Sequence, residues 1–163
     1  MQILKSAFFY FLNIKTQISN FFRIVYYSSK YYHSSIESKK PKQFFFFPNS
    51  FLLSSFTNYK DFSLKISSVD PYNFWVKQNT KEEEHNLHGF LWLNVLDRKN
   101  EAGVIRKIIE IWITKNKRYN STTWEETLTS KRVISWILNA DIILESSNHF
   151  FKEKFLKSII LQT

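Results

Sequence analysis

The sequence has no cysteine and only two glycines among its 163 residues. The absence of cysteine excludes disulfide bonds, thiolate metal sites and cysteine-based catalysis. Two glycines leave few places for tight backbone turns and are too few to build a glycine-rich phosphate loop. The chain also has no serine nucleophile elbow, no zinc-finger spacing and no RNP-type motif. These absences exclude several common enzyme and nucleic-acid-binding classes.

Hydrophobic residues are abundant by contrast. They make up 44% of the chain, aromatic residues make up 18%, and phenylalanine alone occurs 17 times. Disordered chains have few aromatic residues, so this composition argues against disorder. A chain of this length fits one domain and is long enough to bury a core.

The net charge of +9 is unevenly distributed. Residues 1–60 contain eight Lys or Arg and a single acid, whereas residues 61–163 contain fifteen basic and thirteen acidic residues. One interpretation is that the N-terminal third meets an anion, such as nucleic acid, acidic lipid or an acidic polysaccharide. The alternative is a solvated basic face without a partner.

Residues 1–43 are predicted to form an amphipathic helix followed by a basic linker. Apolar residues fall at helical spacing over 3–28, with a break expected near Lys15. The apolar run is far below the ~20 residues of a membrane span, and no small-residue cleavage site follows it. The helix either packs on a core or lies on a membrane surface. Residues 30–50 are predicted to be the linker.

Residues 44–80 are predicted to contain short strands and a connecting segment. Phe62, Leu64 and Ile66 alternate with polar residues, which is the pattern of a half-buried strand. A small hairpin is therefore expected within residues 51–68. The run of four phenylalanines at 44–47 is expected to dock on the helical part or on further chain.

Residues 81–163 are predicted to be helical throughout. The apolar periodicity places helices at 84–97, 101–116, 124–145 and from 147 onward. Thr122 and Glu125 are expected to form a capping box before the third of these helices. The fourth helix is still apolar and periodic at the last residue, from which we expect the sequence to be a fragment of a longer protein.

Three segments carry a resemblance to a known family. They are Asp70-Pro71-Tyr72-Asn73-Phe74-Trp75, then Leu87-His88-Gly89-Phe90-Leu91-Trp92-Leu93, and then Trp124 followed by Thr129-Ser130-Lys131-Arg132-Val133-Ile134-Ser135-Trp136-Ile137. Their order and spacing resemble the N-terminal region of the heparinase II/III-like family, over roughly residues 44–163. The sequence departs from the family pattern at residues 51–69, where relatives usually have glycines and this chain has none.

The resemblance implies a mainly α fold, the start of an α/α toroid of stacked helical hairpins. Characterised relatives are polysaccharide lyases, which abstract the proton next to a uronate carboxylate and eliminate the 4-linked sugar. Their catalytic Tyr and His lie further along the chain than residue 163, so no catalytic residue is assigned here. The implied partner is an acidic polysaccharide bound through the full-length protein, and neither a cofactor nor a metal is expected.

The candidate substrate-binding residues are His88, Trp92, Trp124, Arg132 and Trp136. The tryptophans either stack on sugar rings or pack in the helical core. Arg132 either binds an acidic group of the sugar in bidentate fashion or forms a salt bridge or helix cap within the protein. His88 shares a helical face with His85, but two histidines without a third ligand are weak evidence for metal.

Two functions compete at this point. The first is the substrate-binding portion of a polysaccharide lyase-like protein, with a groove lined by Trp124, Arg132 and Trp136. The second is a helical module that binds nucleic acid or a membrane surface through the basic N-terminal third. A third interpretation is a helical scaffold without a ligand.

Overall fold

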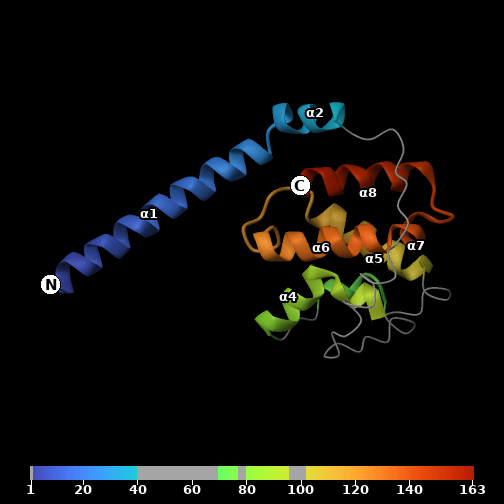
Figure 1. Ribbon diagram of the computed structural model, residues 1–163, viewed down its shortest axis with the longest axis horizontal. Coiled ribbons are helices and arrows are strands. Elements are labelled where there is room, and N and C mark those ends of the chain that lie inside the picture. The colour runs from blue at the N-terminus through green and yellow to red at the C-terminus, as the bar shows by residue number, and fades with distance from the viewer. Residues whose placement is uncertain (1, 40–69, 77–79, 96–101) are drawn as a thin grey trace.

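The computed structural model describes residues 2–39, 70–76, 80–95 and 102–163 (Figure 1). Within these residues the fold is mainly α, as predicted, and it contains no strand. The expected hairpin at 51–68 and the phenylalanine run at 44–47 lie outside the described residues. The elements are α1 (Gln2–Tyr27), α2 (Lys30–Ser38), η2 (Asn73–Trp75), α4 (Lys81–Gly89), η3 (Leu91–Val95), α5 (Ala102–Lys115), α6 (Glu126–Leu138), α7 (Ala140–Leu144) and α8 (His149–Gln162).

The N-terminal helix α1 is continuous, without the break expected near Lys15. Figure 1 shows it pointing away from a body formed by the other helices. The predicted linker is wrong over its first part, because residues 30–38 form α2. The Ser29 side chain accepts a hydrogen bond from the Tyr32 amide and so caps α2. Serine is a favoured N-cap because it satisfies a backbone donor that the helix itself leaves free.

The predicted helix at 84–97 is two elements. The α4 helix begins with a capping box formed by Thr80 and Glu83, and it ends at Phe90, whose φ of 56° is left-handed. A residue with a β-carbon loses roughly 1–2 kcal/mol in the left-handed backbone region. The complete burial of the Phe90 ring offsets this cost. The chain then continues as the short 3-10 helix η3.

The predicted helix at 124–145 is also two elements, α6 and α7, which meet at Asn139. The expected capping box of Thr122 and Glu125 is wrong. Glu125 itself is the N-cap of α6, and its carboxylate accepts a hydrogen bond from the Leu128 amide at 2.9 Å. Backbone hydrogen bonds from Leu128 and then Thr127 lower the pKa of the Glu125 carboxyl.

Helices α6 and α8 run antiparallel in the body (Figure 1). Arg132 of α6 bonds Gln162 of α8, while Trp136, one turn later, packs on Phe155, two turns earlier in α8. The α2 helix lies over α8, where the Tyr32 hydroxyl donates to the Leu161 carbonyl and Lys157 pairs with Glu37.

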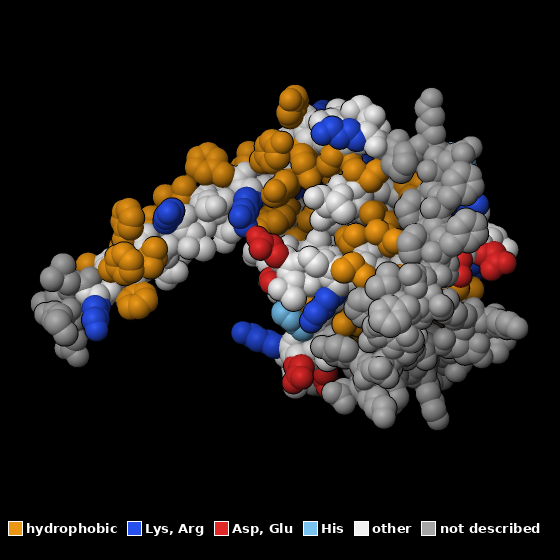
Figure 2. All heavy atoms as spheres, viewed as in Figure 1, with side chains coloured by type: hydrophobic (Ala, Val, Ile, Leu, Met, Phe, Trp, Pro, Cys, Tyr) orange, Lys and Arg blue, Asp and Glu red, His pale blue; other side chains and the backbone are white. Residues whose placement is uncertain are grey.

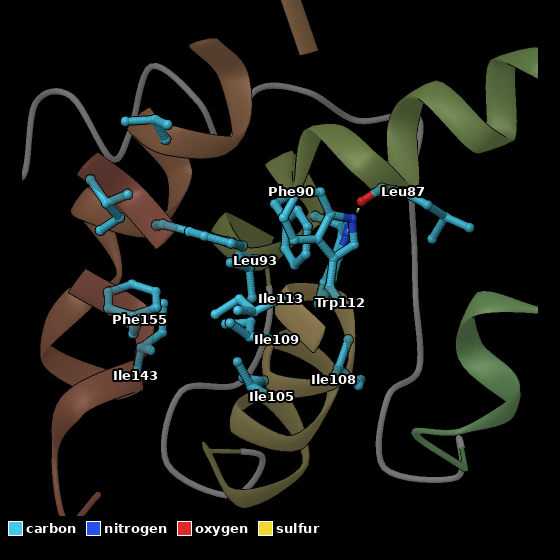
Figure 3. Close-up of a cluster of buried hydrophobic side chains, with 14 of the residues drawn as sticks. Leu87, Phe90, Leu93, Ile105, Ile108, Ile109, Trp112, Ile113, Ile143 and Phe155 are labelled. Atoms are coloured by element: carbon cyan, nitrogen blue, oxygen red, sulfur yellow. Dashed lines mark hydrogen bonds between the residues drawn. The ribbon is translucent and has the colours of Figure 1, made fainter. Parts of the chain in front are cut away.

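The core lies between α4, η3, α5, α6 and α8, and part of it is shown in Figure 3. Its centre is aromatic: the Phe90 ring lies 5.4 Å from Trp92, 5.8 Å from Trp112 and 5.2 Å from Trp136. Offset and edge-to-face pairs of this kind add stability beyond the area that they bury. Isoleucines of α5 extend this cluster toward Ile143 and Phe155 (Figure 3).

Candidate functional site

Arg132 is fully buried, and its guanidinium connects four segments of the chain. One terminal nitrogen donates to the carbonyls of His88 and Thr123, each at 3.0 Å. The other donates to the Thr129 hydroxyl at 3.1 Å, and Nε donates to the Gln162 side chain. The carbonyl of His88 belongs to the last turn of α4, so Arg132 acts as a cap on that helix, one of the alternatives considered above.

The Arg132 guanidinium also lies over the Trp112 ring, 4.2 Å from its centroid. Burial lowers the pKa of Arg132 to about 9, which still leaves it protonated at neutral pH. The charge is thus held by carbonyl dipoles and an aromatic face, and the described residues place no acid against it. No part of Arg132 is accessible to a sugar.

His88 is buried next to this guanidinium. Its Nδ1 accepts a hydrogen bond from Trp112 Nε1 at 2.8 Å, and its ring stacks on Trp75 at 5.4 Å. Burial, then the positive charges of Arg132 and His85, lower the pKa of His88 to about 4. His85 is exposed, and the described part of the chain contains no cluster of three metal-ligating side chains. His88 is therefore a neutral residue of the core.

The His88 environment predicts a pH dependence of stability. A histidine whose folded pKa lies below its unfolded value of about 6.5 stabilises the protein above pH 6.5, and this contribution is lost as the pH falls toward 4. We expect the free energy of unfolding to fall by up to about 3 kcal/mol across that window. Denaturant titrations at several pH values between 7 and 4 measure the effect.

The matched variants are His88→Gln, which keeps an acceptor for Trp112, and His149→Gln, which removes an exposed histidine. His88→Gln should flatten the pH dependence between 6.5 and 4, and His149→Gln should leave it unchanged. The Glu125 carboxyl has a lowered pKa, so its own contribution is lost only at lower pH. Equal slopes for wild type and His88→Gln would contradict this account.

Trp92 and Trp136 are core residues, exposed by 2% and 0% respectively. Trp92 Nε1 donates to the Leu87 carbonyl at 3.1 Å, which fixes the ring across the end of α4. Trp136 contacts Phe90, Trp112 and Phe155. The prediction of a groove lined by Trp124, Arg132 and Trp136 is therefore wrong, because Arg132 and Trp136 are buried in the core.

Arg132 is one of three buried polar residues that lie on one side of α6 and its C-cap, Asn139. Arg132, Ser135 and Asn139 follow helical spacing and bond successive points of α4 and η3. Ser135 donates to the Phe90 carbonyl at 2.6 Å, and Asn139 donates to the Asn94 side chain at 2.7 Å. Arg132 and Ser135 thus bond backbone carbonyls around the left-handed turn at Phe90, and Asn139 bonds a side chain of η3.

Trp124 is the one candidate that reaches the surface. It is half-buried, and its Nε1 donates to the Asn116 carbonyl at 3.2 Å. Two neighbouring pockets share Trp124 and Leu161 in their linings. Trp124 thus lies at the junction of two hollows on the surface beside α8.

The first pocket has a volume of about 260 Å³ and an aromatic wall. The wall is a continuous series of ring contacts: Tyr32 to Tyr27 at 4.9 Å, Tyr27 to Tyr119 at 5.4 Å, and Tyr119 to Trp124 at 6.0 Å. Arg23 of α1 and Glu126 of α6 provide charges of opposite sign at the same pocket. Aromatic walls offer flat apolar faces next to polar groups.

The second pocket has a volume of about 560 Å³, and its largely apolar lining includes four Lys or Arg side chains. Lys154 is paired there with Glu110 at 3.8 Å, and Lys157 is paired with Glu37. Lys117 and Arg118 are exposed and have no acid against them among the described residues. His33 and Asn116 also line this pocket.

Sequence reasoning missed the residues of both pockets other than Trp124. The four aromatic residues come from α1, α2 and the segment before α6, so no single motif contains them. The pair Lys117-Arg118 was visible in the sequence, but nothing in its spacing separates it from an ordinary solvated surface. A scan against protein-family models gives no match, and searches of curated proteins and of solved structures give none either.

Proposed function

We propose that this chain is the N-terminal portion of a heparinase II/III-like polysaccharide lyase and that it binds an acidic, uronate-containing glycan beside Trp124. The observation that carries the glycan-binding proposal is the pair of pockets that meet at Trp124, one aromatic and one basic. The resemblance over residues 44–163 supports the family assignment. Helices α4 to α8, with the antiparallel pair α6 and α8, would be the first hairpins of the α/α toroid.

The chemistry of an acidic sugar fits this arrangement. The C–H face of a sugar ring is apolar and stacks on an aromatic ring, which Trp124 and Tyr119 provide. A carboxylate or sulfate accepts charge-assisted hydrogen bonds from cations, which Lys117 and Arg118 provide. Glu126 would repel an anion from the aromatic pocket, so the acidic group is assigned to the basic one.

This chain would position substrate and would not itself perform the elimination. In the family, a base removes the proton next to the uronate carboxylate and the 4-linked sugar leaves. None of the residues described above is assigned that task. His88, the candidate histidine from the sequence, is buried with Nδ1 already occupied. Its lowered pKa and its burial argue against general-base work.

The test is binding of uronate-containing oligosaccharides, such as hyaluronan or heparin fragments, to the 163-residue chain by titration calorimetry. Lys117→Gln with Arg118→Gln should weaken binding by roughly tenfold, which corresponds to one lost charge-assisted contact. Trp124→Ala should weaken it by a similar factor through the lost ring face. A neutral glucan should bind weakly to all forms.

The control is the double variant Lys81→Gln with Lys152→Gln, which removes the same charge from exposed residues outside both pockets. It should bind glycan as the wild type does. An equal loss in both double variants would mean unspecific attraction to a basic protein, and it would overturn the assignment of the site. Nucleic acid binding that depends on Lys117 and Arg118, with no glycan binding, would overturn it as well.

A further inference from the structure

The N-terminal helix α1 is exposed over most of residues 5–26. It carries apolar side chains that the described elements of the body leave uncovered: Phe8 is 60% exposed, Phe11 67%, Ile18 52% and Phe22 65%. Figure 2 shows hydrophobic side chains along this helix where it extends from the body, with basic side chains between them. Soluble surfaces rarely present apolar area over such a length, and where they do it marks an interaction site.

The apolar side chains of α1 are concentrated on one face. Phe11, Ile14, Ile18, Phe22 and Val25 recur at spacings of three and four residues, which brings them to the same side of a helix. Asn13, Thr16 and Asn20 lie on the opposite side. Over residues 11–25 the helix is therefore two-sided, whereas Phe9, one turn before Asn13, adds an exposed ring on the other side.

The charge of α1 has a single sign. Lys5, Lys15 and Arg23 are its ionisable side chains apart from tyrosines, and it contains no acid. The basic residues of α2 and the segment that follows it continue this bias, so that residues 1–60 hold a net charge of +7. An anionic surface complements this charge, whereas a second copy of the same helix would bring like charges together.

The length and polarity of α1 decide how it would meet a membrane. In the described part of the chain, no helix is both apolar enough and long enough to cross a bilayer. A two-sided helix with basic residues and many aromatic rings lies in the plane of the interface instead, with its apolar face among the acyl chains. Phenylalanine and tyrosine side chains are suited to that depth because their rings are largely apolar.

We infer that α1 binds the surface of a membrane rich in anionic lipid, lying parallel to it with the face of Phe11, Ile18 and Phe22 inserted. Lys5, Lys15 and Arg23 contact the headgroups. The body of the protein is held beside the membrane through α2, which packs on α8. This inference differs from glycan binding in its ligand and in its inserted face, since Phe11, Ile18 and Phe22 line neither pocket. Arg23 and Tyr27 are the residues of α1 that also line the aromatic pocket.

The first test is co-sedimentation of the full chain with vesicles of phosphatidylcholine containing phosphatidylglycerol. Substituting Lys5, Lys15 and Arg23 with glutamine should weaken binding by roughly 100-fold, since each basic residue near an anionic surface contributes about fivefold. The matched control replaces Lys81, Lys115 and Lys152 with glutamine, which removes the same charge from exposed residues of the body. This control should bind nearly as the wild type does.

The second test reports the orientation of the helix. Phe11→Trp and Asn13→Trp place a fluorophore on opposite faces, because two residues advance about 200° around a helix. With the emission of the five native tryptophans subtracted by means of the wild type, vesicles should shift the emission of Phe11→Trp to shorter wavelength and protect it from an aqueous quencher. Asn13→Trp should remain accessible to the quencher. Neither substitution touches the core, so the fold itself is not at risk.

Three results would overturn the inference. One is the absence of binding to anionic vesicles by the wild type at low and moderate salt. Another is binding in which Phe11→Trp and Asn13→Trp respond alike, which would mean that the helix is not inserted by one face. The third is an α1-dependent dimer in sedimentation, or α1-dependent binding of duplex DNA, in a chain that ignores vesicles.

Discussion

Replacing Arg132 with methionine is expected to lower the free energy of unfolding by about 3–5 kcal/mol. Methionine keeps an unbranched apolar stem but has no donor. The carbonyls of His88 and Thr123 would lose a buried hydrogen-bond partner, and so would the side chain of Gln162. Leaving buried acceptors unsatisfied costs about 1–3 kcal/mol each. We expect their sum to exceed the desolvation penalty that is relieved when the buried charge is removed. Chemical denaturation followed by tryptophan fluorescence measures the change.

Two further variants make this result specific. Arg132→Lys should lose about 2–3 kcal/mol, because one ammonium cannot reproduce a planar group that donates in four directions. Lys152→Met also removes a positive charge and keeps an unbranched side chain, but on an exposed residue of α8. Its free energy of unfolding should stay within about 0.5 kcal/mol of the wild type. A loss below about 1 kcal/mol for Arg132→Met would contradict the structural role described above.

Arg132→Lys separates the two interpretations of Arg132 that the sequence left open, contact with a sugar and a structural role within the protein. If Arg132 contacted a sugar, Arg132→Lys would change glycan affinity even in the folded fraction. Because the guanidinium is fully buried, we expect the folded Arg132→Lys protein to bind glycan as the wild type does. The loss should appear in stability alone, which a thermal melt with and without glycan can show.

Replacing Trp136 with alanine is the second change with a large expected effect, about 3–5 kcal/mol of stability. The ring is fully buried at the centre of the aromatic cluster and contacts Phe90, Trp112 and Phe155. Its removal leaves a cavity between α5, α6 and α8 that the surrounding helices cannot close. Denaturant midpoints give the size of the effect.

Trp136→Phe is the informative partner of this variant. Trp136 Nε1 is buried and has no hydrogen-bond partner among the described residues. Phenylalanine removes that unsatisfied donor while it keeps most of the ring volume, so we expect a loss of about 1 kcal/mol or less. If Trp136→Phe proved as damaging as Trp136→Ala, the indole nitrogen would have a role that the packing does not show.

Trp124→Ala provides the comparison between core and surface. Trp124 is half-buried and donates to the Asn116 carbonyl, so its removal should cost about 1–2 kcal/mol of stability and, in addition, glycan affinity. Trp136→Ala should show the opposite, a large loss of stability with unchanged glycan affinity in the folded protein. The two tryptophans occupy similar positions in the sequence pattern, and only their accessibility distinguishes them.

The helices were predictable where apolar residues repeat over several turns. The ranges expected for α1, α5 and α8 agree with those observed to within two residues. Prediction failed where one local interaction overrides the repeat. Phe90 enters the left-handed region because its buried ring and its carbonyl bond to Ser135 hold it there, and this ends α4 early. Nothing in the local sequence marks Phe90 for that conformation, since glycine is the usual residue there.

The candidate site was predictable only at Trp124. Periodicity identifies which residues of a helix share a face, but it does not say whether that face meets the core or a ligand. Arg132 illustrates the difficulty, because an arginine near two glutamates suggests a surface ion pair. Its actual partners, the carbonyls of His88 and Thr123, are backbone groups that carry no sequence signature.

The sequence by itself determined the helical class of the fold, the lack of thiol chemistry and the one-sided charge of the first sixty residues. These properties depend on residue type and spacing along one chain. Tertiary structure decided which aromatic rings fill the core, that Arg132 is enclosed, and that rings from α1, α2 and the segment before α6 meet around Trp124. Such outcomes depend on pairings between distant segments, and a side chain's burial is fixed by the partner that its helix meets.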